Sequence, residues 1–238
     1  MNTVEARRDL AAALRYTARL GLHEGIANHY SLAVSDDGRR FLMNPYGRHW
    51  SLMRASDLLE LDADVETATG GDVDPTAMAI HGALHRNIPR ARCVMHLHSR
   101  YATALASLKD PVMKPIDQNT MRFFNRVAID DGFDGMGLGV EAERLATCLG
   151  NRSILLMGQH GILVVGASVA QCFDDIYYFE RAAETYITAL STGADLNVAT
   201  DAVAEKTARQ WEEYPGFADK HLAAIRDILD FQEPEYRA

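Results

Sequence analysis

The chain has 238 residues, of which 47% are hydrophobic and 24% charged, a composition typical of a folded protein with a full core. Its net charge of −9 argues against the basic surface that nucleic acid binding requires, so we expect no nucleic acid partner. The three cysteines form no paired motif, the N-terminus carries no apolar leader, and no stretch approaches the roughly 18 apolar residues of a membrane span, so we expect a cytoplasmic protein without a membrane partner.

The first quarter of the chain predicts a helix followed by a hairpin. Residues 4–21 carry apolar side chains at helical spacing, and Gly21 is a suitable residue to end that helix. The segments YSLAV and RFLMN flank a turn at residues 36–38, which is the pattern of a β-hairpin. A loop at residues 44–47 follows, and LLELD is then expected to form a further short strand.

The rest of the chain alternates between helical and strand patterns. Residues 76–87 predict a helix that Pro89 ends, CVMHLH predicts a strand, and residues 101–108 predict another helix. SILLMGQHGILVVG reads as two apolar strands around a turn, and two helices are expected over residues 168–189 and 215–231. Hairpins interspersed with helices indicate an α/β fold with a mixed, largely antiparallel central sheet covered by helices.

We expect residues 1–238 to form a single domain with a C-terminal helical tail from about residue 200. Tyr214 and Tyr236 lie in that tail. Because chain termini are commonly poorly ordered, we expect these tyrosines to be solvated, with contact to a neighbouring subunit as the alternative.

Three histidines have the spacing of a metal site. His96 and His98 are two residues apart on a predicted strand, so their side chains share one face of it. His160 lies in the Gly-Gln-His-Gly turn between the two later apolar strands. Three imidazoles suit Zn²⁺, Mn²⁺, Fe²⁺ or Co²⁺ and leave coordination positions open for a substrate. Taken alone, the pair on the strand is a weak signal, and satisfied or exposed histidines without a metal are then the favoured interpretation.

Several long segments resemble the class II aldolase/adducin family. They are NHYSLAV, MNPYGRHWSLMRASDLLELD, PTAMAIHGALHRNIPRARCVMHLHSRYATALASL and LLMGQHGILVVGASVAQCFDDIYYFERAAETY, so that the resemblance covers roughly residues 5–195. It implies a three-layer α/β/α fold in which His96, His98 and His160 bind a divalent metal ion. It also implies a homo-oligomer, often a tetramer, with active sites between subunits.

The chain departs from the sugar-phosphate aldolases of that family at two places. Those enzymes have a catalytic glutamate four residues before the histidine that matches His81, and Ala77 stands there in this sequence. Those enzymes also bind phosphate through serines beside that glutamate and through a Ser-Gly-Asn turn. In this sequence only Thr76 remains of the serines, and Asn28-His29 stands in place of the turn. The chain therefore resembles the branch of adducin-like proteins and of metal-dependent decarboxylases that act on hydroxylated aromatic or pyridine carboxylic acids.

The residues expected to bind substrate lie mainly in one loop. Tyr46, Gly47, Arg48 and His49 follow the hairpin, and the Arg48 guanidinium has the shape to hold a substrate carboxylate. Asn28 and Thr76 are expected to join them.

Two further histidines are candidates for catalysis. His29 is a candidate proton donor or anion ligand, with a structural role as the alternative. His81 is expected to pack behind the metal site, although its spacing from His85 also suits a chelating pair on one helix face.

The combined pattern favours a metal-dependent carbon–carbon lyase that acts on a small carboxylate, most simply a decarboxylase. A metal that stabilises the electron pair left at carbon serves decarboxylation as well as aldol cleavage. An aldolase that acts on a non-phosphorylated 2-oxo acid and a non-catalytic, adducin-like binding module are the alternatives.

Overall fold

The computed structural model describes residues 3–65, 72–132, 134–135, 138 and 140–238. Within these residues, seven strands form one sheet in the order β3-β2-β1-β4-β7-β6-β5. In chain order the strands are β1 (His29–Ala33), β2 (Arg40–Met43), β3 (Leu59–Asp62), β4 (Cys93–Leu97), β5 (Val127–Asp130), β6 (Ile154–Met157) and β7 (Gly161–Gly166). The β5–β6 pair is parallel and the other five pairings are antiparallel, which confirms the predicted mixed sheet.

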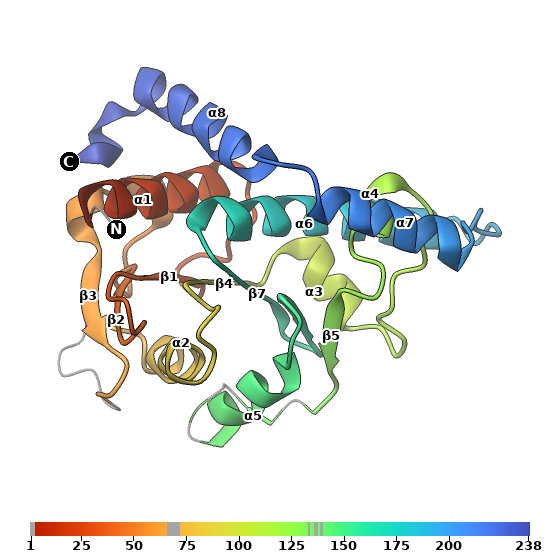
Figure 1. Cartoon of the computed structure of the whole chain (residues 1–238), viewed down its shortest axis with the longest axis horizontal. Helices are drawn as coiled ribbons and strands as arrows, with labels where there is room; N and C mark the ends of the chain where they lie inside the picture. The colour runs from red at the N-terminus through yellow and green to blue at the C-terminus, as the bar shows by residue number, and fades with distance from the viewer. Residues whose placement is uncertain (1–2, 66–71, 133, 136–137, 139) are drawn as a thin grey trace.

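Helices cover both faces of the sheet, as the α/β/α expectation requires. Figure 1 shows α1 (Thr3–Arg19), α6 (Val169–Ser191) and α8 (Phe217–Gln232) on one side, and α2 (Pro75–Asn87) and α5 (Val140–Leu149) on the other. The short α3 (Arg100–Ala106) packs against α6. Two further helices, α4 (Gln118–Arg122) and α7 (Asp201–Glu212), pack against each other. Within the described residues, every helix is too short or too polar to span a lipid bilayer.

Strand alternation divides the side chains between two apolar cores. On β4, Cys93, Met95 and Leu97 belong to the core beneath α1 and α6, whereas Val94 belongs to the core beneath α2 and α5. Because residues two apart on a strand share a face, His96 points to the α2 side with Val94. On β1, Tyr30 and Leu32 belong to the α1 side, so His29 and Ser31 also face α2.

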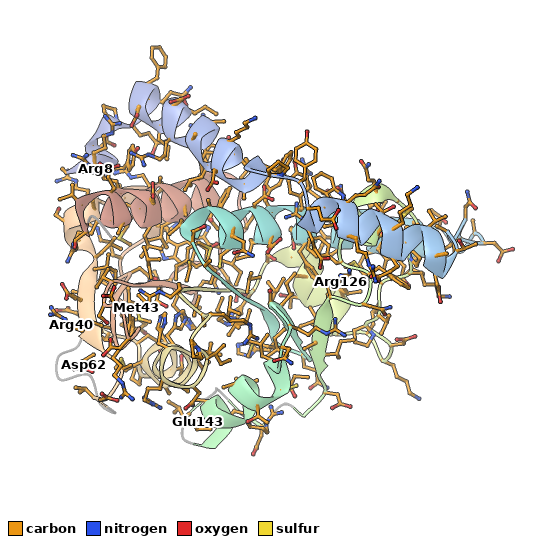
Figure 2. All side chains as sticks on the ribbon, in the orientation of Figure 1. Arg8, Arg40, Met43, Asp62, Arg126 and Glu143 are labelled. Atoms are coloured by element: carbon orange, nitrogen blue, oxygen red, sulfur yellow. The ribbon has the colours of Figure 1, made fainter. Side chains whose placement is uncertain are left out.

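Three described elements lie where no element was predicted, namely α4, β5 and α5, whereas α7 belongs to the predicted helical tail. Two of them are short, since α4 has five residues and β5 has four. The third, α5, has ten residues and packs Leu145 and Leu149 into the core that it shares with α2. At this end of the molecule Arg126, labelled in Figure 2, pairs with Glu205 and Glu212 of α7, and Trp211 of α7 contacts the rings of Tyr178 and Phe217.

The expectation of a solvated C-terminal tail is wrong for Tyr236. Its side chain is fully buried in a small apolar cluster with Ala11, Ala12, Ala55 and Leu229, while Tyr214 is exposed. The physical reason is an inward-facing charge on α1. The buried Arg15 guanidinium forms ion pairs with Glu233 and Glu235 at 2.9 and 2.8 Å and so fixes the segment on either side of Pro234.

Candidate functional site

His96, His98 and His160 meet where β4 ends and β7 begins. Leu97 pairs with Ile162 across these strands, so the residues just beyond them are neighbours. The ring centroids of the three histidines lie 4.8 Å apart in every pair, and one ligand nitrogen from each lies within 4.8 Å of the others. β4 ends at Leu97, one residue earlier than the predicted strand, yet His98 still turns toward His96.

Hydrogen bonds fix the orientation of two of these rings. The Ile162 carbonyl accepts from Nδ1 of His96 at 3.0 Å, and the Glu24 carboxylate accepts from Nδ1 of His98 at 2.6 Å. With the proton on Nδ1 in each ring, both Nε2 atoms are left with lone pairs, and these atoms face each other at 3.0 Å. Two facing lone pairs repel unless a cation lies between them, so this donor set fits a divalent metal ion.

Two glycines let the His160 turn pack against its neighbours. A Cβ at Gly158 would lie 2.6 Å from the Asp130 carbonyl oxygen, and a Cβ at Gly161 would overlap the Leu97 carbonyl oxygen. Between them, Gln159 adopts a φ of 56°, a left-handed conformation that is uncommon for a residue other than glycine. The Gly-Gln-His-Gly sequence therefore places His160 beside the end of β4.

A buried carboxylate on α6 positions the segment after His98. Glu180 accepts hydrogen bonds from the Ser99 hydroxyl at 2.7 Å, from Tyr101 N at 2.8 Å and from Ala102 N at 2.9 Å. It thus satisfies the free amides at the start of α3, as a capping residue does. Sequence reasoning missed Glu180, although a charged residue within the buried part of an aromatic-rich helix is a signal that could have found it.

The three histidines line a cavity of about 530 Å³. Of the other predicted site residues, His29, Tyr46 and Thr76 also line it. Asn28 is buried beside it, where its side-chain oxygen accepts a hydrogen bond from Glu24 N at 2.6 Å. The cavity is open, so a small molecule can reach the nitrogen atoms of the cluster.

The structure does not bring Arg48 and His49 into this cavity of the same chain. Arg48 forms an ion pair with Asp57 at 3.0 Å and donates a hydrogen bond to the Leu52 carbonyl. The His49 ring packs against His23, with their Nε2 atoms 2.9 Å apart. Gly47, with a φ of 79°, turns the chain between Tyr46, which lines the cavity, and Arg48 and His49, which do not.

A carboxylate that sequence reasoning missed also lines the cavity. Asp74 caps α2, and its Oδ1 accepts hydrogen bonds from Thr76 N, Thr76 Oγ1 and Ala77 N at 2.8, 2.7 and 3.3 Å. Burial opposes its ionisation, but these bonds outweigh burial and lower the pKa of Asp74. Ala77 itself is buried in an apolar cluster with Phe41 and Met78.

Four buried side chains continue from the cavity into the space between β1 and α2. Nδ1 of His29 lies 2.7 Å from Nε2 of His81, and the Ser31 hydroxyl lies 2.5 Å from Nδ1 of His81 and 2.8 Å from Nε2 of His85. Burial lowers the pKa of His29 to about 3 and that of His85 to about 4, and it holds the pKa of His81 well below its usual value. All three rings are therefore neutral at pH 7.

Comparison with known proteins agrees with this geometry. The model of the class II aldolase and adducin N-terminal domain matches residues 8–187. The chain belongs to the class II aldolase and adducin family. It is 34% identical over 194 residues, 80% of its length and 75% of the relative's, to a Caulobacter vibrioides protein whose name places it in aldolase class 2.

Two more relatives cover nearly the whole chain. A crystal structure of an aldolase II superfamily protein from Pseudomonas syringae is 31% identical, with a TM-score of 0.89 and coverage of 99% of this chain and 96% of that one. The decarboxylase NovR of Streptomyces niveus is 28% identical over 243 residues, which cover 93% of this chain and 86% of NovR. The fold and the family thus extend over the described site.

Proposed function

We propose that this family member is a metal-dependent carbon–carbon lyase, and specifically a decarboxylase of a hydroxylated aromatic, heteroaromatic or oxo carboxylic acid. The observation that carries the proposal is the pair of Nε2 atoms of His96 and His98, which face each other at 3.0 Å beside His160 and an open cavity. The likeness to NovR, a decarboxylase, over 93% of the chain supports the reaction type.

In this proposal His96, His98 and His160 hold Zn²⁺, Mn²⁺, Fe²⁺ or Co²⁺. The ion would polarise the oxygens of a substrate carboxylate and stabilise the electron pair left on carbon when CO₂ departs. His29 transfers the proton to that carbon, since its ring lines the cavity and lies 4.8 Å from the His96 ring between centroids. His81 holds His29 in place through the 2.7 Å hydrogen bond.

Other cavity residues would orient the substrate. Tyr46 and Thr76 offer hydroxyl groups, and the Asp74 carboxylate favours the protonated form of His29 during turnover. Four further predicted residues contribute to substrate binding either by shaping the loop and turn beside the cavity or by reaching the cavity of a neighbouring subunit: Asn28, Gly47, Arg48 and His49. The second possibility requires a homo-oligomer, and we propose a tetramer. The cytoplasm is the proposed location.

A second candidate is an aldolase that acts on a non-phosphorylated 2-oxo acid. The observation that favours it is Asp74, because a carboxylate that lines the cavity three residues before Ala77 can stand in for the missing aldolase glutamate. The negative charge of Asp74 disfavours an anion that binds close by, but this applies to both candidate substrates and does not separate the two reactions. A non-catalytic, adducin-like module is the third reading, and such a module needs no metal.

Purified protein loaded in turn with each of the four metals tests these functions. We expect CO₂ release from a member of a panel of hydroxybenzoates, hydroxylated pyridine carboxylates and 2-oxo acids, and loss of that release in His96→Ala. His221→Ala, in a cluster far along the chain, is the matched control and should retain activity. Cleavage of a 4-hydroxy-2-oxo acid without CO₂ release would favour the aldolase, and a protein that takes up no metal would favour the binding module.

A further inference from the structure

A continuous row of hydrogen bonds runs from the cavity to the far end of α2. It begins at His29, passes through His81, Ser31 and His85, and ends at the Ala91 carbonyl, which lies 2.9 Å from Nδ1 of His85. His29 lines the cavity, and the other three side chains are fully or almost fully buried behind it. What the row does for catalysis rests on the role proposed above for His29.

The row follows from matched spacings on two elements. His29 and Ser31 are two residues apart on β1, which is about 6.6 Å along a strand. His81 and His85 are four residues apart on α2, which is about 6 Å along a helix. Because these spacings agree, the two pairs interleave, and each donor or acceptor meets one partner. The sequence shows both pairs but not that they face each other.

The Ala91 carbonyl gives the row a direction. A carbonyl can only accept, so Nδ1 of His85 carries the proton and its Nε2 accepts. Ser31 must then donate to His85, which leaves the Ser31 oxygen to accept from Nδ1 of His81. Nε2 of His81 is consequently an acceptor, and it takes its hydrogen bond from Nδ1 of His29.

We infer that Ser31 and His85 are positioning residues that fix the tautomer of His29, so that Nδ1 carries the proton and Nε2 presents a lone pair to the cavity. A ring in this state cannot donate to the cavity first. His29 must therefore take a proton at Nε2, from a substrate hydroxyl or a water molecule, before it gives one to carbon.

This order of events agrees with decarboxylation of a hydroxylated acid. His29 takes the hydroxyl proton, the bond between carbon and the carboxylate breaks, and its electron pair stays on carbon while CO₂ leaves. The same proton then passes from Nε2 to that carbon, which restores the starting tautomer. The oxygen of the product regains its proton from water, so each turnover consumes one proton overall.

Nitrogen-15 NMR of protein labelled in its histidines tests the inference without a substrate. Long-range proton–nitrogen spectra distinguish the two neutral tautomers, and the spectra are recorded for protein stripped of metal and for protein loaded with diamagnetic Zn²⁺. We expect His29, His81 and His85 all to carry the proton on Nδ1, with the signals assigned from single histidine substitutions.

Two variants remove hydrogen bonds that fix the tautomer of His29. Ser31→Ala deletes the hydroxyl that His81 donates to, and His85→Phe deletes the acceptor while it keeps the stacking on Phe41, whose ring centroid lies 4.7 Å away. In both, the form with the proton on Nε2 should become the major one at His29, although neither change touches that residue. Thr17→Val removes a buried hydroxyl that hydrogen-bonds to Tyr30, and as the matched control it should leave all three tautomers unchanged.

A wild-type His29 with its proton on Nε2, or an unchanged His29 tautomer in a folded Ser31→Ala or His85→Phe protein, would overturn the inference. The expected tautomers together with an absence of CO₂ release from every acid would instead overturn the proposed function and leave the positioning role standing. The two failures are therefore distinguishable.

Discussion

Two polar clusters in this molecule differ in what surrounds their side chains, one around Arg122 and the other around His96. Around Arg122, a cavity of about 640 Å³ contains paired charges: the guanidinium binds Asp174 and Asp175 at 2.7 Å each and lies over the rings of Tyr178 and Trp211. Around His96, the Nε2 atoms of His96 and His98 face each other at 3.0 Å beside His160. The first cluster supplies its own counter-charges, whereas the second is a set of nitrogen donors that fits a divalent metal ion. A set of metal donors beside an open cavity is the better candidate for function.

The largest difference between the two clusters should appear in metal content when one of the three proposed metal-binding histidines is removed. We expect His98→Ala to lose stoichiometric metal while the chain stays folded, because two nitrogen donors hold a divalent ion far more weakly than three. Elemental analysis of the purified variant measures this. The control is His221→Ala, which removes an imidazole 2.6 Å from Asp174 in the Arg122 cluster and should leave the metal content unchanged. Full metal content in His98→Ala would show that the ion binds elsewhere.

The reverse experiment uses Arg122→Ala. Removal of this guanidinium leaves the buried carboxylate of Asp174 without its arginine, so we expect a loss of about 3–5 kcal/mol of unfolding free energy, as for other broken buried pairs. Urea denaturation measures the loss. The metal content per folded chain should not change. A variant of wild-type stability that had lost its metal would contradict the distinction between the two clusters.

Acid should destabilise the fold through the histidine row. Burial lowers the pKa of His85 from 6.5 to about 4 in the folded state, so the unfolded chain binds more protons between these values. Stability that is present above pH 6.5 is therefore lost as the pH falls toward 4, by up to about 3 kcal/mol for this group. We expect the loss of stability between pH 6.5 and 4 to be smaller in His85→Phe than in the wild type, as measured by urea denaturation at each pH. An equal loss in both proteins would assign the acid sensitivity to other groups.

The smallest effect on metal binding is expected for Glu24, which supports a proposed metal ligand without being one. Glu24 accepts from Nδ1 of His98 at 2.6 Å and thereby orients its Nε2. Glu24→Gln keeps the shape but loses the charge, and we expect metal affinity to fall about 10-fold, the lower end of the range for such supporting residues. Competition with a chelator of known affinity measures it. Glu184→Gln, a surface change on α6 that breaks the ion pair between Glu184 and Arg181, should have no effect.

The sequence was sufficient where chemistry and local pattern coincide. The strand period placed His96 and His98 together, and the glycines around His160 marked the turn that must approach β4. Partners far along the chain were not predictable in this way. Glu180 lies 81 residues from Ser99, Glu24 lies 74 residues from His98, and His29 lies 52 residues from His81. No local period reports such pairings, because they arise only when helices pack on the sheet.

The same reasoning explains the predictions that did not succeed. Tyr236 was expected to be solvated because it lies near the C-terminus. Its burial depends on the ion pairs of Arg15 on α1, and no sequence pattern near the C-terminus reveals them. Arg48 looked like a cavity residue because of its loop. Its ion pair with Asp57, nine residues further on, holds it outside the cavity of its own chain.

The surroundings of Ala77 also bear on how this protein can change over time. Its methyl group packs with Ala33, Phe41, Met43, Ala63 and Met78, and almost none of it is exposed. A glutamate introduced there would place a carboxylate among apolar side chains, at a cost of several kcal/mol, before it could help any reaction. A single substitution is thus a costly way to place an aldolase-like carboxylate at this position. Several neighbours would have to become smaller or more polar first, and each such change would weaken the core without any benefit of its own.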